Sequence, residues 1–388
     1  MNCTIIDQID AIDPQQWNRL SIDGNPFLRH EFLAALEHHQ CVGERYGWIP
    51  QHVVAVAANG QLLGAMPLYL KDNSYGEFVF DWGWADAYHR AGLAYYPKLV
   101  TAIPYTPATG PRLLIAPNAP WDQVANALID KALELAASMK VSSLHWLFTN
   151  AQDSYHLEQK DLLTRMGCQF HWHNHNYEDF DEFLAQLSSR KRKQIKRERR
   201  HVSDAQITLK VLHGNEISEA QLHQFHRHYH GTFYRLGGYA TLSEAFFAEI
   251  SQTMTENVVF VLAHYNKQHV ASAFCVRGKD TLYGRHWGCD ADFNSLHFEA
   301  CYYQGIDYCI RHGLKHFEPG AQGEHKVSRG FVPTATYSHH WIENEQFRPI
   351  IAEFLQREQQ GVRHYMESLN EHLPYRVNAE HSLSREQQ

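Results

Sequence analysis

The chain has 388 residues, of which 44% are hydrophobic and 20% are charged, and its formal net charge is −8. This composition excludes intrinsic disorder over most of the chain, and the length predicts two domains or one large α/β domain. The most apolar stretch, residues 52–70, is interrupted by Asn59, Gly60 and Pro67 and falls short of the ~20 apolar residues that a membrane-spanning helix needs. The N-terminus has neither the basic region nor the long apolar run of a signal peptide, so we expect a cytoplasmic protein without a membrane span.

Two parts of the chain that lie 205 to 207 residues apart carry matching features. The matched pairs are the apolar segments 53–56 and 258–261, the apolar segments 62–70 and 269–277, and the dipeptides Trp82-Gly83 and Trp287-Gly288. A shared register of this kind predicts two copies of one β-β-β-helix unit, in which the third strand ends at Trp-Gly. The alternative is that strands rich in aromatic residues resemble one another without being repeats.

Periodic apolar residues predict the helices between these strands. The expected helices are 120–140, 179–187, 294–312 and 350–369, and further short strands are expected at 141–148 and 315–318. This alternation predicts an α/β fold of two similar domains, residues 1–170 and 171–388, each a mixed sheet flanked by helices. The polar end, residues 381–388, is expected to be a loose tail.

The seven cysteines are scattered along the chain and never form a C-x-x-C pair. A disulfide framework or a zinc ribbon needs closer, paired spacing, so we expect reduced and mostly buried thiols. The three alternating histidines at 171, 173 and 175, and those at 226, 228 and 230, could share one face of a strand. Because no carboxylate or cysteine completes either set, we expect no metal site. The motifs of nucleotide triphosphatases, Rossmann dehydrogenases, α/β-hydrolases and zincins are also missing, which disfavours those classes.

One short segment of the chain is strongly basic. Eight of the eleven residues from Arg190 to Arg200 are basic and only Glu198 is acidic, which leaves 27 of the 35 basic and 42 of the 43 acidic residues elsewhere. So much like charge repels itself unless anions neutralise it, and arginine suits bidentate phosphate contacts. We therefore predict that a phosphate-rich ligand, namely a nucleotide, a coenzyme tail or RNA, docks here; a solvated charged face is the alternative. The expected phosphate contacts are Arg190, Arg192, Lys193, Lys196 and Arg197.

The segment from Glu318 to Phe331 follows the last predicted strand of the second domain and combines glycines with ionisable residues. Loops beyond the ends of strands in α/β domains commonly bind ligands. Acyl transfer needs a base for the acceptor amine and positive charge for the developing oxyanion. We therefore expect Glu324, His325 and Lys326 to be catalytic, and Glu318 and Arg329 to contact the substrate. Ordinary loop polarity is the alternative.

A second group of expected substrate contacts is Arg285, His286 and Trp287. They occupy the place in the second repeat where the first repeat has Asp81 and Trp82. Cationic groups in place of an acid indicate that the second domain holds the functional centre. A structural tryptophan at a domain boundary is the alternative.

Residues 188–200, 285–289, 296–305 and 318–331, together with the opening Asn25-Pro26-Phe27-Leu28, resemble the FemAB-like predicted N-acyltransferases, sometimes labelled peptidoglycan biosynthesis proteins. The resemblance covers nearly the whole chain and implies tandem GNAT-like acyltransferase domains. In Fem-like enzymes a Phe-Lys pair before Gly-Phe lies close to the bound substrate. The run from His325-Lys326 to Gly330-Phe331 is similar, which makes Lys326 the residue expected to stabilise charge.

The resemblance implies transfer of an acyl or aminoacyl group onto an amine. Fem-type relatives take the group from aminoacyl-tRNA and pass it to a peptidoglycan precursor, whereas other GNAT proteins use acyl-CoA. Enzymes that bind coenzyme A usually hold its pyrophosphate on a glycine-containing helix start, but residues 290–299 contain no glycine. This favours an aminoacyl or other donor over acyl-CoA. The alternative function is a non-catalytic GNAT-fold protein that binds RNA or a phosphorylated metabolite through its basic helix.

Overall fold

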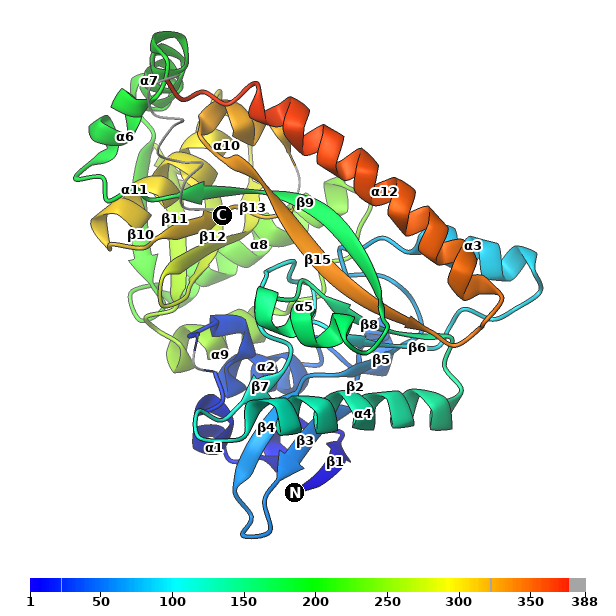
Figure 1. Ribbon diagram of the computed structural model, residues 1–388. Coiled ribbons are helices and arrows are strands. Elements are labelled where there is room, and N and C mark those ends of the chain that lie inside the picture. Colours follow the sequence, from blue (N-terminus) through cyan, green and yellow to red (C-terminus); the bar gives the residue numbers. More distant parts are fainter. Residues whose placement is uncertain (22, 322, 377–388) are drawn as a thin grey trace. The chain divides into compact units, whose positions relative to one another are not determined.

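The computed structural model describes residues 1–21, 23–321 and 323–376, which form two compact units (Figure 1). Unit 1 consists of Met1–Cys168 and Ala335–His364, and unit 2 consists of Gln169–Thr334 and the chain from Tyr365 onward. The chain passes from one unit to the other within strands β9 (Leu163–His173) and β15 (Val332–Ile342) and within helix α12 (Phe347–Asn370). The first segment of unit 1 ends at Cys168, and its second segment, Ala335–His364, falls within the residues 171–388 that the sequence had assigned to the second domain.

Unit 1 contains a four-stranded antiparallel sheet and a second, mixed group of strands. The first sheet has the order β1 (Asn2–Ile6), β3 (His52–Val56), β4 (Leu62–Met66) and β7 (Leu114–Ile115). The second group has the order β15, β8 (Ser143–Leu147), β6 (Lys98–Thr101), β5 (Tyr69–Lys71) and β2 (Ile49–Pro50). Strands β6 and β8 pair in parallel, and the other neighbours in this group are antiparallel.

Helix α4 (Trp121–Met139) covers the first sheet of unit 1 (Figure 1). Val124, Leu128 and Ala132 recur every four residues and are fully buried against that sheet, as expected for the apolar face of an amphipathic helix. The helix ends at Lys140, which has the left-handed backbone conformation of a C-cap. The predicted helix 120–140 is therefore confirmed. The other helices of this unit are α1 (Pro14–Asn18), α2 (His30–His38), α3 (Trp82–Arg90) and α5 (Ala151–Glu158).

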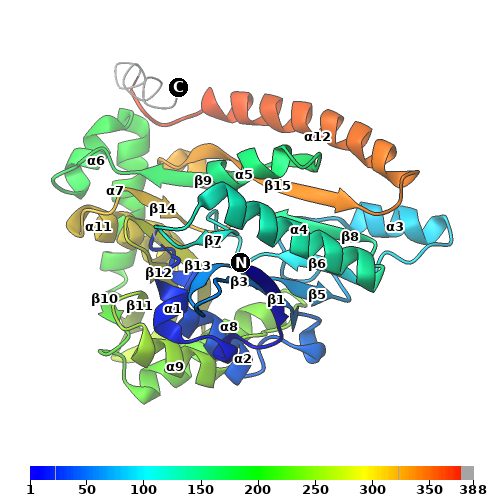
Figure 2. The same cartoon turned by 60° about the horizontal axis from the view of Figure 1, so that its bottom comes forward.

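Unit 2 is built on one mixed sheet with helices on both faces (Figure 2). Its strand order is β10 (Thr208–His213), β11 (Val258–Tyr265), β12 (Gln268–Arg277), β13 (Thr281–Cys289), β14 (His316–Glu318) and β9. Only β13 and β14 pair in parallel. The helices are α6 (Phe180–Gln186), α7 (Ser189–Asp204), α8 (Glu219–Arg235), α9 (Glu244–Thr253), α10 (Leu296–Phe298), a π-helical turn (Glu299–Tyr303), α11 (Gln304–Arg311) and the 3₁₀ helix η5 (Glu324–Arg329).

The predicted repeat is confirmed for two strands and wrong for the third. Strands β3 and β4 in unit 1 and strands β11 and β12 in unit 2 form equivalent antiparallel pairs. In unit 2 the third strand, β13, contains Trp287-Gly288 as expected, but in unit 1 Trp82 opens helix α3. The cause lies just before Trp82, where Glu77 and Asp81 turn inward to bind Lys98 instead of extending into a ladder.

The α/β class and most of the predicted elements are confirmed. Helices α6 and α12 and strands β8 and β14 lie where periodicity placed them. The predicted helix 294–312 is present, although a π-helical turn interrupts it. All seven cysteines are free thiols, but only Cys41, Cys275 and Cys309 are buried, so the expectation that most are buried is wrong. No helix within the described ranges is long and apolar enough to cross a bilayer. The expected tail at 381–388 lies outside the described residues.

Candidate active site

Lys326 lies in η5, a short helix between two glycines with positive φ, Gly323 at 123° and Gly330 at 94°. Both glycines adopt conformations that side chains disfavour, so the sequence folds this loop sharply after β14. The Lys326 side chain is buried, and its Nζ donates a hydrogen bond to the Gly320 carbonyl at 2.7 Å. Burial lowers the pKa of Lys326 to about 8. The amine is therefore mostly charged at pH 7 but close to the point at which it loses its proton.

Arg329 joins three elements of unit 2. Its Nη2 forms an ion pair with Glu198 of α7 at 2.9 Å, and its Nε donates to the Tyr303 hydroxyl of the π-helical turn at 3.1 Å. Its Nη1 donates to the His325 carbonyl at 2.8 Å, and the guanidinium lies 3.5 Å from the centre of the Phe298 ring. Because all three nitrogens are engaged, a substrate that contacts Arg329 would have to compete with these bonds. The geometry favours a role in holding η5 against α7.

His325 belongs to an aromatic cluster beside Lys326. Its Nε2 and the Tyr302 hydroxyl are hydrogen-bonded at 2.9 Å, and the His297 ring lies 6.3 Å from the His325 ring and 5.5 Å from Trp287. Burial lowers the pKa of His297 to about 4, and burial together with Arg329 and Lys326 also lowers the pKa of His325. Both imidazoles are thus neutral at pH 7. His325 is exposed, so it can accept a proton from a ligand.

The other predicted contacts of this region are spread over several positions. Glu324 is exposed and accepts a hydrogen bond from Tyr365 at 2.9 Å. On β13 the alternation of side chains sends Trp287 toward the π-helical turn and His286 to the opposite face, where its ring lies 4.7 Å from Tyr229 of α8. The structure therefore separates His286 from the cluster around Lys326.

Two predicted substrate contacts lie on neighbouring strands of the same sheet. Arg285 of β13 is partly buried, and burial lowers its pKa to about 10. Glu318 ends β14 and pairs in register with Tyr283 of β13. Glu318 lies directly before the loop that leads to η5, whereas Arg285 lies two residues beyond the part of β13 that pairs with β14.

The basic segment forms helix α7, whose buried face is narrow. Ile195, Glu198 and Val202 are buried along one side, at the three- and four-residue spacing of a helix face. The basic side chains are left on the other sides, where five of them line a hollow of about 370 Å³. The five lining residues are Arg192, Lys193, Lys196, Arg197 and Arg200. Four of the five predicted phosphate contacts thus come together, while Arg190 is outside the lining of this hollow.

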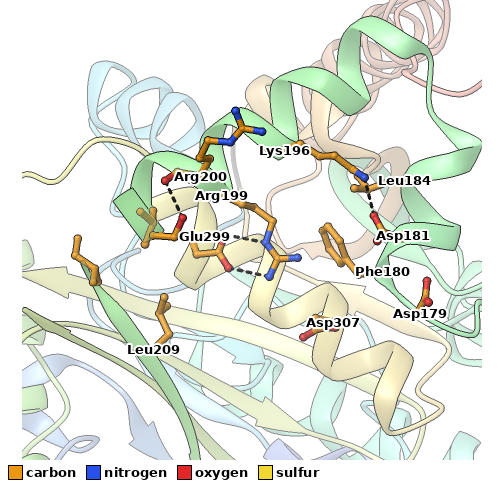
Figure 3. Close-up of a pocket in the computed structure, with 13 residues that line it drawn as sticks. Asp179, Phe180, Asp181, Leu184, Lys196, Arg199, Arg200, Leu209, Glu299 and Asp307 are labelled. Carbon is orange, nitrogen blue, oxygen red and sulfur yellow. Dashed lines mark hydrogen bonds and ion pairs between the residues drawn. The ribbon is translucent and has the colours of Figure 1, made fainter. Parts of the chain in front are cut away.

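A larger pocket of about 670 Å³ lies between α7, α6 and the π-helical turn (Figure 3). Inside it Arg199 forms an ion pair with Glu299, with Nε and Oε2 3.1 Å apart, and its guanidinium lies 4.4 Å from the centre of the Phe180 ring. Lys196 pairs with Asp181 at 2.9 Å at the rim. Apolar side chains complete the walls, namely Leu184, Val202, Ile207 and Leu209. The π-helical turn borders this pocket through Glu299 and borders η5 through Tyr302 and Tyr303.

Sequence reasoning missed Glu198, Glu299 and the π-helical turn. Glu198 stands out as the single acid in the basic run, and that isolation was the available signal. Glu299 lies inside a motif that carried the family resemblance, but nothing in the motif indicates its partner Arg199, which is 100 positions away. Single π-helical turns are frequent at functional sites, and this one supplies side chains to both the pocket and the lysine loop.

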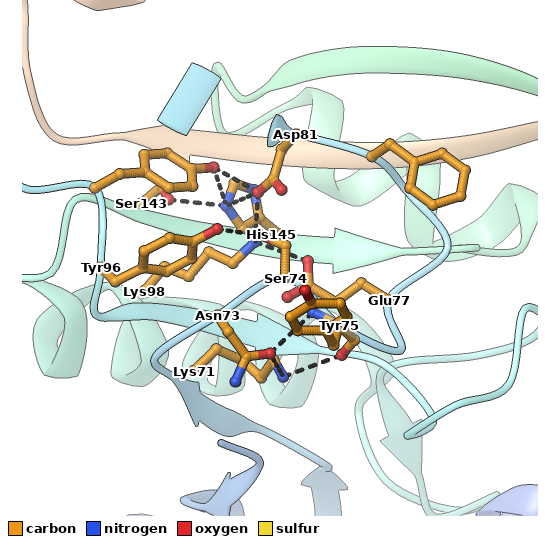
Figure 4. Close-up of polar contacts among 12 residues, drawn as sticks. Lys71, Asn73, Ser74, Tyr75, Glu77, Asp81, Tyr96, Lys98, Ser143 and His145 are labelled. Atoms are coloured by element: carbon orange, nitrogen blue, oxygen red, sulfur yellow. Dashed lines mark hydrogen bonds and ion pairs between the residues drawn. The ribbon is translucent and has the colours of Figure 1, made fainter. Parts of the chain in front are cut away.

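A different polar cluster is buried in unit 1 (Figure 4). The Lys98 ammonium binds Glu77 at 2.7 Å and Ser74 at 2.9 Å, and it also pairs with Asp81. Although burial alone would lower the pKa of Lys98, the two carboxylates outweigh burial and raise it. Tyr95 donates to Asp81 at 2.6 Å and so extends this network.

The described residues contain no group of three or more His, Cys, Asp or Glu side chains that could hold a metal ion. The expectation that the alternating histidines share one face of a strand is wrong for His226, His228 and His230, which lie in helix α8. His171 is buried in strand β9, and His228 is buried and hydrogen-bonded to Ser272 at 2.9 Å.

Comparison with known proteins identifies one family and several solved structures of similar fold. The model of the FemAB-like family, described as peptidoglycan biosynthesis/recognition, matches residues 8–377. The crystal structure of FemX is similar with a TM-score of 0.53 at 11% identity, covering 91% of this chain and 100% of that chain. The C-terminal domain of a putative lysylphosphatidylglycerol synthetase from Agrobacterium fabrum has a TM-score of 0.53 at 8% identity, covering 90% and 96%.

A third similar structure is L-PGS from Bacillus licheniformis, with a TM-score of 0.51 at 11% identity, covering 89% of this chain and 96% of that chain. At these identities the likeness shows a shared fold. Among proteins with curated functions, none matches this chain.

Proposed function

Because the chain belongs to the FemAB-like family, as the resemblance predicted, we propose that it is an N-acyltransferase that moves an acyl or aminoacyl group onto an amine acceptor. The observation that carries this proposal is the buried amine of Lys326, which lies beside neutral imidazoles and next to the π-helical turn that walls the 670 Å³ pocket. Fixed positive charge at such a place suits a reaction in which an oxyanion develops.

In the proposed reaction the acceptor amine attacks the carbonyl carbon of the donor. The carbonyl oxygen takes up negative charge, and the protonated Lys326 ammonium stabilises it. His325 removes the proton from the attacking nitrogen, which its neutral imidazole can do at pH 7. Collapse of the tetrahedral intermediate forms the amide bond and breaks the bond to the donor's leaving group, which takes up the proton from the His325 imidazolium. Glu324 is exposed beside His325 and is the second proposed base.

The proposed donor carries a chain of phosphates. The hollow on α7 is lined by five basic side chains, and arginine and lysine at this density bind polyanions. Aminoacyl-tRNA fits this surface better than acyl-CoA, because it offers many phosphates in a row, whereas residues 290–299 lack the glycines that usually hold the pyrophosphate of coenzyme A. By the same family membership, the proposed acceptor class is an amine on a peptidoglycan precursor.

A second candidate function rests on α7 alone. A protein that binds RNA or a phosphorylated metabolite without catalysis would also use the five-residue hollow. It would have no need for the amine of Lys326, so variants of that residue separate the two functions.

Thermal unfolding with acetyl-CoA, coenzyme A and charged tRNA in parallel identifies the donor. A ligand at 100 times its Kd stabilises a protein by about 2.7 kcal/mol, which raises the midpoint by several degrees. Stabilisation by charged tRNA alone supports the aminoacyl donor. Stabilisation by acetyl-CoA would overturn that donor assignment in favour of a coenzyme A enzyme.

Transfer of a labelled aminoacyl group to an amine acceptor tests the reaction itself. Lys326→Ala and His325→Ala should abolish transfer, while Lys279→Ala, at an exposed lysine of the same unit, should leave it unchanged. Transfer that survives both substitutions would show that the catalytic assignment is wrong. If tRNA binds but no label is transferred, the non-catalytic function is supported.

A further inference from the structure

Unit 1 exposes a group of large apolar side chains that its fold does not require on the surface. They lie on the segment 74–82, called here the strap, and on one side of α12. The six side chains are Tyr75, Phe78, Phe80, Trp82, Ile350 and Phe354, and each is between 38% and 67% exposed. We call them the aromatic platform. Within the strap the polarity is inverted, because the charged side chains Glu77 and Asp81 are buried while the aromatic side chains face solvent.

Hydrogen bonds and ion pairs from the residues packed under the strap hold it in place. Trp48 donates to the Tyr75 carbonyl at 3.1 Å, and the Tyr105 amide donates to the Gly76 carbonyl at 3.1 Å. Beneath these, the Lys98 ammonium binds Ser74, Glu77 and Asp81 (Figure 4). Phe78 has a φ of 61°, a strained conformation for a bulky residue that persists where the surroundings enforce it. The aromatic rings are therefore presented in a fixed arrangement.

Arg165 ties α12 to the strap and makes the platform continuous. Its Nη1 donates to the Phe80 carbonyl at 2.8 Å, while its Nε and Nη2 bind the two carboxylate oxygens of Glu358 on α12, each at 2.7 Å. Phe354 and Ile350 lie one and two helical turns before Glu358 and thus on the same side of the helix. Both views show α3, which begins at Trp82, beside the first turns of α12 (Figures 1 and 2), where Trp84 and Ile351 share one apolar cluster.

The charged side chains around the platform are mostly paired with one another. The arginines that border it occur in ion pairs, Arg90 with Asp86 at 3.1 Å and Arg357 with Glu353 at 3.7 Å. Residues 72–89 contain no lysine or arginine at all. Such a surface offers nothing to the phosphates of a nucleic acid, which bind through basic side chains. The binding partner that suits the platform is therefore an amphipathic surface without net charge.

The extent of the platform argues against a second protein copy. Aromatic side chains bury roughly 150–250 Å² each, so the five aromatic side chains and Ile350, each about half exposed, present on the order of 600 Å². A lasting dimer needs roughly 800 Å² from each partner. By contrast, a few tryptophan, tyrosine and phenylalanine rings are the side chains that settle at the boundary between lipid headgroups and acyl chains.

We propose that the aromatic platform docks unit 1 onto the headgroup region of a lipid bilayer, and that it recognises zwitterionic lipid without a requirement for anionic lipid. The rings of Phe80 and Trp82, whose centres lie 5.3 Å apart, would enter the interface together. This docking is independent of the proposed acyl transfer, and either can fail without the other.

Co-sedimentation of the full chain with vesicles of phosphatidylcholine alone, and of phosphatidylcholine mixed with phosphatidylglycerol, tests the proposal. We expect binding to both vesicles with little dependence on salt. Phe80→Ser with Trp82→Ser should weaken binding by about tenfold or more, because apolar area entering the interface drives it. The matched control is Tyr234→Ser with Leu236→Ser, which removes two exposed apolar side chains of unit 2 and should leave vesicle binding unchanged.

Three results would overturn the proposal. The first is an absence of binding to either vesicle, and the second is binding that the Phe80 and Trp82 substitutions leave unchanged. The third is binding to the anionic vesicle alone that is lost on replacement of Arg192 and Lys196, which would assign it to α7. Circular dichroism of each variant shows whether it is folded. Sedimentation velocity reports whether the platform instead joins two copies of the chain.

Discussion

Both units contain buried lysines, Lys71 and Lys98 in unit 1 and Lys326 in unit 2, and Lys98 and Lys326 are held in opposite ways. Lys98 of unit 1 binds two carboxylates, Glu77 and Asp81, whereas Lys326 of unit 2 donates to one backbone carbonyl, that of Gly320. The pKa of Lys98 is raised because the carboxylates outweigh burial, and the pKa of Lys326 falls to about 8 because burial dominates. Burial alone therefore does not decide what a lysine does; its partners do.

This difference separates a structural cation from a reactive one. The charge of the Lys98 ammonium is neutralised by the two carboxylates that it binds, and these contacts hold the strap in place. The Lys326 ammonium has no carboxylate in hydrogen-bond contact among its described partners, so its charge remains available to an anionic reaction centre. The predictions below test this contrast in order of decreasing effect.

Replacement of Lys98 should cause the largest change in stability. Lys98→Met leaves the Glu77 and Asp81 carboxylates buried without their cation, and breaking a buried pair in this way costs about 3–5 kcal/mol. Urea denaturation measures the loss in the free energy of unfolding. Lys279→Met, at an exposed position, is the control and should change it by less than about 0.5 kcal/mol. A near-neutral Lys98→Met would mean that the network contributes no net stability.

Replacement of Lys326 should lower the rate of the reaction while leaving the stability of the fold nearly unchanged. Lys326→Gln keeps a hydrogen-bond donor toward Gly320 but removes the charge, and loss of one stabilising group at an oxyanion costs about 10²–10³ in rate. Steady-state kinetics should show the fall in kcat/KM, with the unfolding midpoint within a few degrees of the parent protein. Unchanged kcat/KM would remove Lys326 from the catalytic machinery and, with it, the contrast with Lys98.

Glu198 should couple the basic helix to the lysine loop. Glu198→Gln removes the charge that Arg329 and Tyr303 both contact, and hydrogen bonds to charged groups are worth about 1.5–3 kcal/mol. The free energy of unfolding should fall by that amount. A double-mutant cycle with Arg329→Gln should give a coupling energy of similar size. Additive effects of the two substitutions would show that the pair does not link α7 to η5.

The role of Glu198 marks the limit of prediction from the sequence. Local patterns were enough to predict the structure where neighbours along the chain determine it. Examples are helix α4, with its buried Val124 and Leu128, and the side of α7 on which Arg192 and Lys196 lie. They failed where distant residues decide it. The Glu198–Arg329 pair spans 131 positions and the Arg199–Glu299 pair spans 100, and no periodicity reports such partners.

The strap illustrates the same limit in unit 1. The repeat predicted a third strand that ends at Trp82-Gly83. The structure instead turns Glu77 and Asp81 inward because Lys98, from a strand further along the chain, supplies the charge that makes their burial possible.

The pH dependence of transfer should report His325 and Lys326 together. The base must be neutral, and the pKa of His325 is lowered from 6.5, so kcat/KM should rise with pH and level off before neutrality. The cation must be protonated, so kcat/KM should fall about tenfold per pH unit above pH 8. If Lys326→Arg remains active, the alkaline limb should vanish, because arginine stays protonated throughout. An alkaline limb that persists in this variant would belong to another group.

The smallest expected effect is the alkaline pH dependence of stability, in which the contribution of Lys326 should change between pH 7 and pH 9.5 and that of Lys98 should not. The folded pKa of Lys326 is about 8, below its ordinary value of 10.5, so between these pH values the unfolded chain binds more protons and stability rises with pH. Compared with Lys326→Met, the parent protein should therefore gain up to about 1.4 kcal/mol per pH unit in this window. Lys98 has a raised pKa, so its stabilising contribution is complete below the ordinary lysine pKa and is lost only as the pH rises through the folded value. Urea denaturation of the parent and both methionine variants at pH 7 and at pH 9.5 measures the two differences. If the difference between the parent and the Lys98→Met variant changed together with that of the Lys326→Met variant, the two lysines would not be held in opposite ways.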